Sequence, residues 1–456
     1  MASRGDGVSR RLRGGAPRRL RGDAMQALLN GYFKLDENKT TVRTEILAGV
    51  TTYLTMAYII FVNPAILKGT GMDAGALFTA TCLAAAYGSL AMGLYANYPV
   101  AMAPGMGLNA YFAFGVVLGM KQPWQAALGA VFLSGVLAMI VSVLPIREYI
   151  VNAIPKSLKM AISAGIGLFL GIIALENAGI VVAHPATLVT LGKVASPAVL
   201  LMAIGFVAMI ALDARGVPGA IIIAILGVTA IGVAFGLTPF KGVVDVPPSP
   251  MPGLLKLDLG AAVQLGLLTI VFTFFFVDFF DTTGTLVGVA HRAGMLDKDG
   301  KLPRLGRALV ADSSASIVAA AIGTSSTTSY IESAAGVKAG GRTGLMAATV
   351  GVLFLLSLFF APLALSIPNF ATAPALLFVA CLMARGMTEV DWEDVTEYAP
   401  AVVCALVMPL TYSIAHGIAF GFITYVVGKI LAGRPSEAHP AVIAIAALFV
   451  VKFALL

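Results

Sequence analysis

Long apolar stretches alternate with short polar stretches along most of the chain. A bilayer core about 30 Å thick is crossed by about 20 apolar helical residues. The stretches that meet this requirement lie near residues 44–62, 75–95, 98–119, 124–145, 156–175, 197–213, 218–237, 261–288, 308–322, 324–338, 343–365, 370–386, 398–414 and 415–431. They predict an all-α polytopic membrane protein with fourteen transmembrane segments. A further apolar stretch, 440–456, is an extra C-terminal segment that either spans the membrane or lies along its surface.

Basic residues are divided unevenly between the two sets of alternating loops. The loops on the side of the amino terminus carry seventeen Lys and Arg residues, and the loops on the other side carry five. Lys and Arg are enriched in the cytoplasmic loops of membrane proteins. The counts therefore predict an amino terminus in the cytoplasm and support the fourteen-span arrangement.

The composition agrees with this arrangement and disfavours other classes of protein. Hydrophobic residues make up 59% of the 456 residues and charged residues only 12%, with a mean hydropathy of +0.92. An average soluble domain is roughly 25% charged. A soluble enzyme, a disordered chain and a nucleic-acid-binding protein are therefore disfavoured, despite the net charge of +7. Five of these positive charges lie in residues 1–24, which are either a basic disordered tail or a start that is not native; we expect no chemistry there.

Two features suggest that the second seven spans repeat the first seven. An Ile-Pro pair opens the fifth span at Ile154 and the twelfth span at Ile367, 213 residues later. Helix-breaking residues interrupt the third span at 99–109 and the tenth span at 323–330. Because halves with an odd number of spans insert in opposite orientations, the sequence predicts two inverted seven-span repeats.

The two interruptions are candidate parts of a substrate site. Irregular backbone persists inside a membrane only where it lines a cavity or is buried in protein, and paired breaks mark binding sites in transporters. Half-helix ends then direct unpaired N–H groups at a polar ligand. The candidate substrate-binding residues at the breaks are Gly105, Met106, Gly107, Asn109, Ser325, Ser326 and Thr327. The alternative is a pair of kinks filled by neighbouring helices, in which Asn109 only caps a short helix.

Carboxylates also lie in these spans. Asp278 and Asp281 are in the eighth span, and Glu332 follows the break in the tenth. An ionised carboxylate at the bilayer centre costs about 2.5–3.5 kcal/mol, so we expect all three to face a cavity and to take part in proton coupling. The alternative, strongest for Asp278, is a structural hydrogen bond. Glu45, at the start of the first span, is expected at the membrane interface.

Other chemistry finds no support in the sequence. The chain has no Ser-His-Asp or Cys-His grouping, and its four His and three Cys residues lack metal-ligand spacing. We therefore expect no enzyme, no metal and no cofactor apart from the coupling proton.

Four stretches resemble the AzgA-like purine permeases of the nucleobase–cation symporter and nucleobase–ascorbate transporter superfamily. They are, in the same order along the chain, Phe33–Tyr58, Ala103–Tyr111, Val277–Leu286 and Gly323–Ser333. The resemblance implies that short strands break spans three and ten and that substrate binds between them. It also implies a core domain of residues 40–146 and 261–366, and a gate domain of residues 150–240 and 367–432.

The resemblance implies an activity as well. A protein of this family would be a secondary active transporter that imports adenine, guanine or hypoxanthine by proton symport and alternating access. It would act in the bacterial inner membrane and form a homodimer, without nucleic acid. In the family, carboxylates of spans eight and ten hydrogen-bond the base, which implies this role for Asp281 and Glu332. Asp278 and Asn109 also match residues that matter in AzgA-like carriers.

Two other functions remain open on the same fold. An anion carrier of the sulfate or bicarbonate type favours a basic residue near the broken spans, where this chain has Glu332. A uracil- or xanthine-type permease is the second. The xanthine and urate branch carries an Asn-x-Gly-x4-Thr signature in span ten, whereas residues 324–328 read Thr-Ser-Ser-Thr-Thr, which disfavours xanthine and urate.

Overall fold

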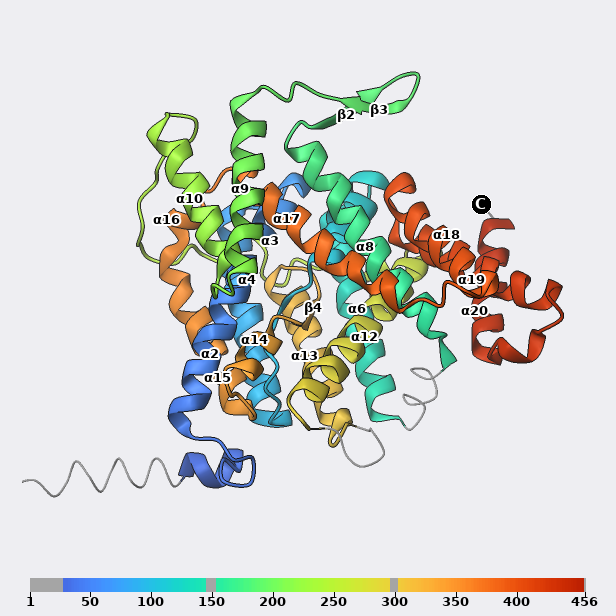
Figure 1. Cartoon of the computed structure of the whole chain (residues 1–456), viewed down its shortest axis with the longest axis horizontal. Helices are drawn as coiled ribbons and strands as arrows, with labels where there is room; N and C mark the ends of the chain where they lie inside the picture. The colour runs from blue at the N-terminus through green and yellow to red at the C-terminus, as the bar shows by residue number, and fades with distance from the viewer. Residues whose placement is uncertain (1–27, 145–152, 296–301, 455–456) are drawn as a thin grey trace, which may run out of the picture.

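The chain folds into a bundle of apolar helices. The computed structural model describes residues 28–144, 153–295 and 302–454, so the predicted tail 1–24 lies outside the described residues. Within these ranges, ten helices are long and apolar enough to cross a membrane, and four shorter apolar helices accompany them. The predicted helical membrane fold is therefore confirmed (Figure 1).

One set of helices combines two distant parts of the chain. Its members are α2 (Val42–Met56), α3 (Ile59–Leu67), α4 (Ala74–Leu90), α5 (Met106–Ala110), α6 (Trp124–Val143), α11 (Leu259–Ala262), α12 (Leu265–Arg292), α13 (Leu305–Ile322), α14 (Ser333–Lys338), α15 (Gly344–Ser357) and α16 (Ala361–Ala364). We call this set the first bundle: α13 packs on α6 and α4, and α15 packs on α2 and α4. Small residues allow the close packing, since a Cβ at Gly49 would lie 2.6 Å from the Thr349 Cβ.

A second set of helices packs beside the first. Its members are α8 (Lys156–Asn177), α9 (Pro197–Ala214), α10 (Ala220–Ala234), α17 (Asn369–Ala384), α18 (Val395–Thr411) and α19 (Ile414–Leu431). In this second bundle, α8 lies against α17 and α18, and α9 lies against α10 and α17. Gly165 and Gly167 of α8 permit this contact, because Cβ atoms there would press on Met408 and Met383.

The third and tenth predicted spans are interrupted by short strands. β1 (Met102–Pro104) precedes α5 and a π-helical segment, Tyr111–Gly119, while β4 (Thr327–Ser329) precedes the short helix α14. The two strands pair antiparallel, with Met102 opposite Ser329 and Pro104 opposite Thr327. The strands implied by the resemblance are therefore present, and their pairing brings the two breaks side by side.

The last two predicted spans, 398–414 and 415–431, are divided at a definite point. Tyr412 has a left-handed backbone (φ 51°) that ends α18, and the Ser413 hydroxyl caps α19 by accepting a bond from the His416 N–H at 3.3 Å. The C-terminal apolar segment forms α20 (Pro440–Ala454), which lies beside α19 (Figure 1). A hairpin of β2 (Val181–His184) and β3 (Leu188–Leu191) projects at the top of the view in Figure 1.

Candidate functional site

The paired strands form the centre of the candidate site. The Gly105 N–H donates to the Ser326 carbonyl at 2.9 Å, and the Tyr330 hydroxyl donates to the Pro104 carbonyl at 2.6 Å. A Cβ at Gly105 would lie 2.8 Å from Thr328 Cγ2, so glycine is needed for this close approach. Each half of the predicted substrate site therefore fixes the backbone of the other.

A buried amide anchors the start of the tenth-span break. Asn63 of α3 is fully buried, and its Nδ2 donates to Thr81 Oγ1 at 2.8 Å and to Thr324 Oγ1 at 2.9 Å. Asn63 thus links the second half of the chain to helices α3 and α4. An amide in an apolar span is stable only with such partners.

Asp278 of α12 holds the tenth-span break in place through hydrogen bonds. It is 1% exposed, and its Oδ2 accepts from Ser316 of α13 at 3.0 Å and from Ser326 at 2.9 Å. Its Oδ1 is buried and has no hydrogen-bond partner among the described residues. The predicted structural hydrogen bond therefore exists, but it satisfies only one of the two oxygens.

Glu332 closely follows β4 in the chain, and Asp281 lies about one helical turn along α12 from Asp278. The hydroxyl of Tyr58, which is fully buried, donates to Glu332 Oε1 at 2.6 Å. Asp281 lies near Thr328 and close enough to Glu332 for their charges to interact. The structure therefore gathers all three predicted carboxylates around one short strand, although they come from two distant segments.

Where β1 and β4 pair, the two broken spans cross, and we call this place the crossing. Several buried polar groups at the crossing lack hydrogen-bond partners. Among the described side chains, both amide atoms of Asn109 and the hydroxyls of Ser325, Thr327 and Ser329 are buried without one. Asn109 lies within α5 rather than at its start, so the capping alternative for it is wrong. Buried polar groups are nearly always paired in folded proteins. These atoms are consequently available to a polar ligand.

Met106 and Gly107 complete the predicted set, and Gly107 lies where the two bundles meet. Met106 is 9% exposed at the start of α5. A Cβ at Gly107 would collide with the Cγ2 of Ile166, which belongs to α8 of the second bundle. Gly107 therefore allows the two bundles to approach closely beside the crossing.

A cavity of about 190 Å³ adjoins the crossing on one side. It is lined by Gly71, Met72, Asp73, Ala76, Leu77, Trp124, Pro252, Gly253 and Gly323. None of the predicted substrate-binding residues lines it, but Gly323 directly precedes the tenth-span break. Gly323 is therefore the link in the chain between this cavity and the tenth-span break.

Several residues around the paired breaks were missed in the sequence, among them Tyr58, Asp312, Ser316 and Thr282. Asp312 of α13 is 3% exposed and accepts from the Thr282 hydroxyl at 2.7 Å. A search for every carboxylate inside an apolar span finds Asp312. Tyr58 lies within the first stretch that carried the family resemblance, but no sequence signal pairs it with Glu332.

Glu45, at the start of the first span, is fully buried in protein. Its carboxylate accepts from the N–H groups of Arg342 at 2.7 Å, Thr343 at 3.2 Å and Met346 at 3.2 Å. Glu45 therefore stabilises the first turn of α15, whose unpaired N–H groups and helix dipole favour an anion.

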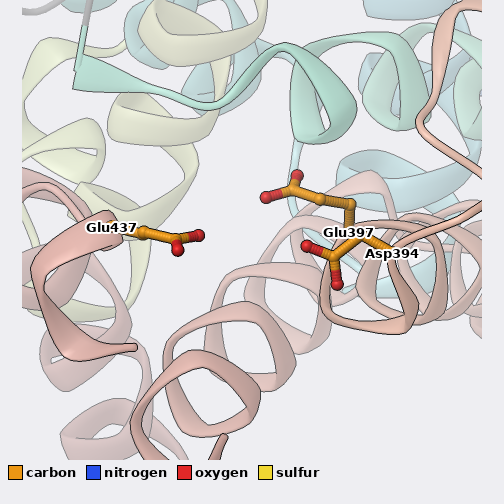
Figure 2. Close-up of side chains that lie close together, drawn as sticks. All are labelled: Asp394, Glu397 and Glu437. Carbon is orange, nitrogen blue, oxygen red and sulfur yellow. The ribbon is translucent and has the colours of Figure 1, made fainter. Parts of the chain in front are cut away.

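Three other carboxylates gather far from the crossing (Figure 2). Asp394 and Glu397 face Glu437 across a gap, at the ends of α18 and α19. The ammonium of Lys429 fills that gap, 2.7 Å from Glu397, 2.9 Å from Glu437 and 3.5 Å from Asp394. The cluster is therefore an ion-pair network between helix ends, in which a cation is already supplied by the chain.

Arg434 completes this network. It lies 2.8 Å from Asp394 and 2.6 Å from Glu437. Hydrogen bonds from Thr396, with help from Arg434 and Lys429, hold the pKa of Asp394 well below its usual range. Hydrogen bonds from Arg434 and Lys429 lower the pKa of Glu437 as well. Both carboxylates are therefore ionised at neutral pH.

Comparison with known proteins agrees with this architecture. A family model described as the permease family matches residues 43–420. Adenine permease AdeP of Escherichia coli is 47% identical, over 94% of this chain and 96% of its own length. Guanine/hypoxanthine permease PbuG of Bacillus subtilis is 45% identical, over 92% of this chain and 98% of its own length. Among solved structures, the transmembrane domain of a cyanobacterial bicarbonate transporter, BicA, superposes with a TM-score of 0.61.

The likeness to BicA covers 84% of this chain and 97% of that chain at 16% identity, so it shows the fold alone. The apolar helices and the relatives together define a multi-pass membrane transporter, not an enzyme. The chain belongs to the permease family whose model it matches, and the resemblance read from the four stretches is confirmed.

Proposed function

We propose that this chain imports a purine nucleobase, either adenine, guanine or hypoxanthine, together with a proton. The observation that carries the proposal is the set of buried, unpartnered polar atoms of Asn109, Ser325 and Thr327 at the two paired breaks. Asp281 and Glu332 lie near the second of these breaks. A purine edge presents fixed donors and acceptors, which such a set can match. The relatives named for adenine, guanine and hypoxanthine at 45–47% identity support the same class of substrate.

In this proposal the base binds between the two broken spans. Asp281 and Glu332 hydrogen-bond its N–H groups, and Asn109 pairs with its polar edge. The backbone of Gly105, Met106 and Gly107 approaches the base from the third-span break. The residues 325–327 approach from the opposing break. A proton binds one of Asp278, Asp281 and Glu332 and lowers the cost of keeping that carboxylate in the membrane.

Transport follows by alternating access between two domains. The first bundle corresponds to the core domain, residues 40–146 and 261–366, and carries every polar group named above. The second bundle corresponds to the gate domain, residues 150–240 and 367–432. We infer that the core slides along the gate at contacts such as Gly107 against Ile166. The segment 440–456 stays outside both domains.

The same proposal includes the membrane topology. We infer fourteen transmembrane segments in two inverted repeats. Ten long helices, shorter helices at 106–119, 220–234 and 395–411, and the β4–α14 break support this number. The uneven Lys and Arg counts support an amino terminus in the cytoplasm, with the carrier in the plasma membrane. The family resemblance also supports a homodimer.

A bicarbonate or sulfate carrier is the second candidate, because BicA shares the fold. Three carboxylates around the crossing create a negative potential that opposes an anion. No described Lys or Arg forms an ion pair with any of the three to offset it. A uracil- or xanthine-type permease is the third candidate, and residues 324–328 disfavour xanthine within it.

Uptake into proteoliposomes tests the proposal. The purified protein is reconstituted, and an acid-outside pH gradient is imposed in buffers with and without sodium. Labelled adenine, guanine, hypoxanthine, uracil, xanthine and bicarbonate are compared. We expect at least one of the first three to accumulate, to need no sodium and to be released by a protonophore. Accumulation of bicarbonate alone, or of none of these compounds under a pH gradient, would contradict the proposal.

A further inference from the structure

Four oxygen atoms at the start of β4 form a closely connected group. Ser316 Oγ lies 3.0 Å from Asp278 Oδ2, 2.8 Å from Ser326 Oγ and 2.9 Å from the Thr327 carbonyl oxygen. Ser326 Oγ also lies 2.9 Å from Asp278 Oδ2. All four residues are buried, with 1% exposure or less. Four short contacts therefore exist within one buried group.

The hydrogen atoms available to this group are too few when Asp278 is ionised. A serine hydroxyl has one hydrogen, and a carbonyl or an ionised carboxylate has none. Two hydrogens must then serve four contacts. If both hydroxyls donate to the carboxylate, the two serine oxygens face each other at 2.8 Å without a hydrogen between them. The Thr327 carbonyl is then left without its donor.

One added proton halves this deficit. With a proton on Asp278 Oδ2, that O–H donates to Ser326, the Ser326 hydroxyl donates to Ser316, and the Ser316 hydroxyl donates to the Thr327 carbonyl. Three of the four contacts then hold a hydrogen. Pro104, opposite Thr327 in the strand pair, has no N–H to donate, so Ser316 is the donor that this carbonyl depends on.

The surroundings of Asp278 favour the protonated form as well. Its Oδ1 is buried without a partner among the described residues, which is costly for a charged group. The titratable groups that face it are acidic: Asp281 on the same helix and Asp312 on α13 interact with its charge, and Glu332 lies beyond Asp281. No ion pair joins a described Lys or Arg to Asp278.

We propose that the coupling proton is held on Asp278 Oδ2, and that Ser316 and Ser326 are positioning residues that connect this proton to the Thr327 carbonyl of β4. The proton comes from solution on one side of the membrane and leaves to the other, and no covalent bond other than O–H forms or breaks. Because β4 carries Thr327 and pairs with β1, its geometry depends on the charge of Asp278. The inference rests on the proposed transport function and adds the location of the proton.

The pH dependence of purine binding tests this inference. The dissociation constants of adenine, guanine and hypoxanthine are measured for the purified protein between pH 5.5 and 8. If binding requires one proton, the dissociation constant of wild type rises up to about tenfold per pH unit at the alkaline end. The Asp278→Asn variant cannot gain or lose this proton, so we expect its dissociation constant to change by less than about twofold over the same range.

The serine variants supply the second readout. Ser316→Ala removes the hydroxyl that links Asp278 to the Thr327 carbonyl and leaves every carboxylate in place, so we expect a flattened pH dependence of purine binding. Ser316→Thr returns a hydroxyl and should restore the pH dependence. Ser313→Ala is the matched control, because this buried hydroxyl of the same helix donates to the Leu309 carbonyl at 2.8 Å and lies outside the group. A merely structural role for Ser316 would change stability and leave the pH dependence intact.

The outcomes separate the two proposals. If wild type binds none of the purines, the proposed function is wrong. If wild type binds a purine with a steep pH dependence that Asp278→Asn retains, the function stands and the proton lies on another group. If Asp278→Asn fails to fold, a wild-type pH dependence in Ser316→Ala overturns the inference by itself.

Discussion

The Tyr58 hydroxyl donates to Glu332 Oε1 at 2.6 Å and joins the first span to the end of the tenth-span break. A hydrogen bond to a charged group contributes about 1.5–3 kcal/mol. We therefore expect Tyr58→Phe to lower kcat/KM for purine uptake by roughly 10- to 100-fold, since the carboxylate loses its fixed orientation. Uptake kinetics in whole cells, normalised to the amount of protein in the membrane, measure this effect.

Tyr53 provides the matched control for that variant. Its hydroxyl lies 2.6 Å from Ser357 Oγ, away from the three carboxylates. Tyr53→Phe removes the same atom from a neighbouring turn, and we expect uptake within about twofold of wild type, because a neutral hydrogen bond contributes only about 1 kcal/mol to stability. Equal losses in both variants would mean that Tyr58 acts through folding alone.

Gly107 tests the contact between the two bundles. A Cβ at this position meets Ile166 of α8, so Gly107→Ala forces α5 and α8 apart. We expect purine uptake to fall by at least about tenfold, since overpacking costs about 1–3 kcal/mol. Ile166→Ala in the same chain makes room for the new methyl group and should restore most of the uptake.

The control for Gly107 is Gly227 of α10, where no atom lies within 4 Å of an added Cβ. Gly227→Ala should leave transport unchanged and raise stability slightly, because alanine is the better helix former. If Ile166→Ala fails to rescue Gly107→Ala, the cause lies in the substrate site and the sliding contact is not at Gly107.

Substitution of Glu45 should lower the stability of the protein without a direct effect on the substrate site. Glu45→Ala leaves the N–H groups of Arg342, Thr343 and Met346 without their acceptor. We expect the free energy of unfolding to fall by only about 3 kcal/mol, because neighbouring groups rearrange and satisfy some of these N–H groups. The melting temperature of the purified protein in detergent should fall clearly, and less for Glu45→Gln, which keeps one acceptor oxygen. Glu37→Ala, in an exposed pair with Lys34, should not change it.

The ion-pair network at the ends of α18 and α19 predicts a dependence of stability on pH. The folded protein holds the pKa of Asp394 and of Glu437 below the usual values. The two carboxylates therefore stabilise the folded protein fully above about pH 4.5, where both are ionised in the folded and in the unfolded state. This stabilisation is lost as the pH falls through their lowered folded-state pKa values. Arg434→Gln should lower the melting temperature at pH 7, and the difference from wild type should shrink toward pH 3. A constant difference would show that these charges do not contribute.

The hydropathy of the sequence predicts most of the helical architecture. Every apolar stretch proposed as a span falls on helix or on one of the two breaks, because the period and length of apolar runs are local properties. The breaks themselves are readable from Pro104, Gly105 and Gly323, which disfavour regular helix. The extent of each half-helix depends on packing and is not visible in the chain.

The contacts between distant spans are the part that sequence reasoning missed. Tyr58 meets Glu332 and Glu45 meets the start of α15, although nearly three hundred residues separate each pair. Such pairs follow from how the spans pack, which local patterns do not encode. Asp312 was missed for a different reason: it lies in a span that has no helix-breaking residue to mark it as part of a site.

The most direct test of the account is equilibrium binding of labelled adenine, guanine and hypoxanthine to the purified protein. Wild type is compared with Asp281→Asn and Glu332→Gln, each shown by gel filtration to be folded. We expect wild type to bind at least one of the three bases and both variants to lose at least about tenfold in affinity, because each loses a charged hydrogen bond. Wild-type affinity in both variants would contradict the placement of the substrate between the paired strands.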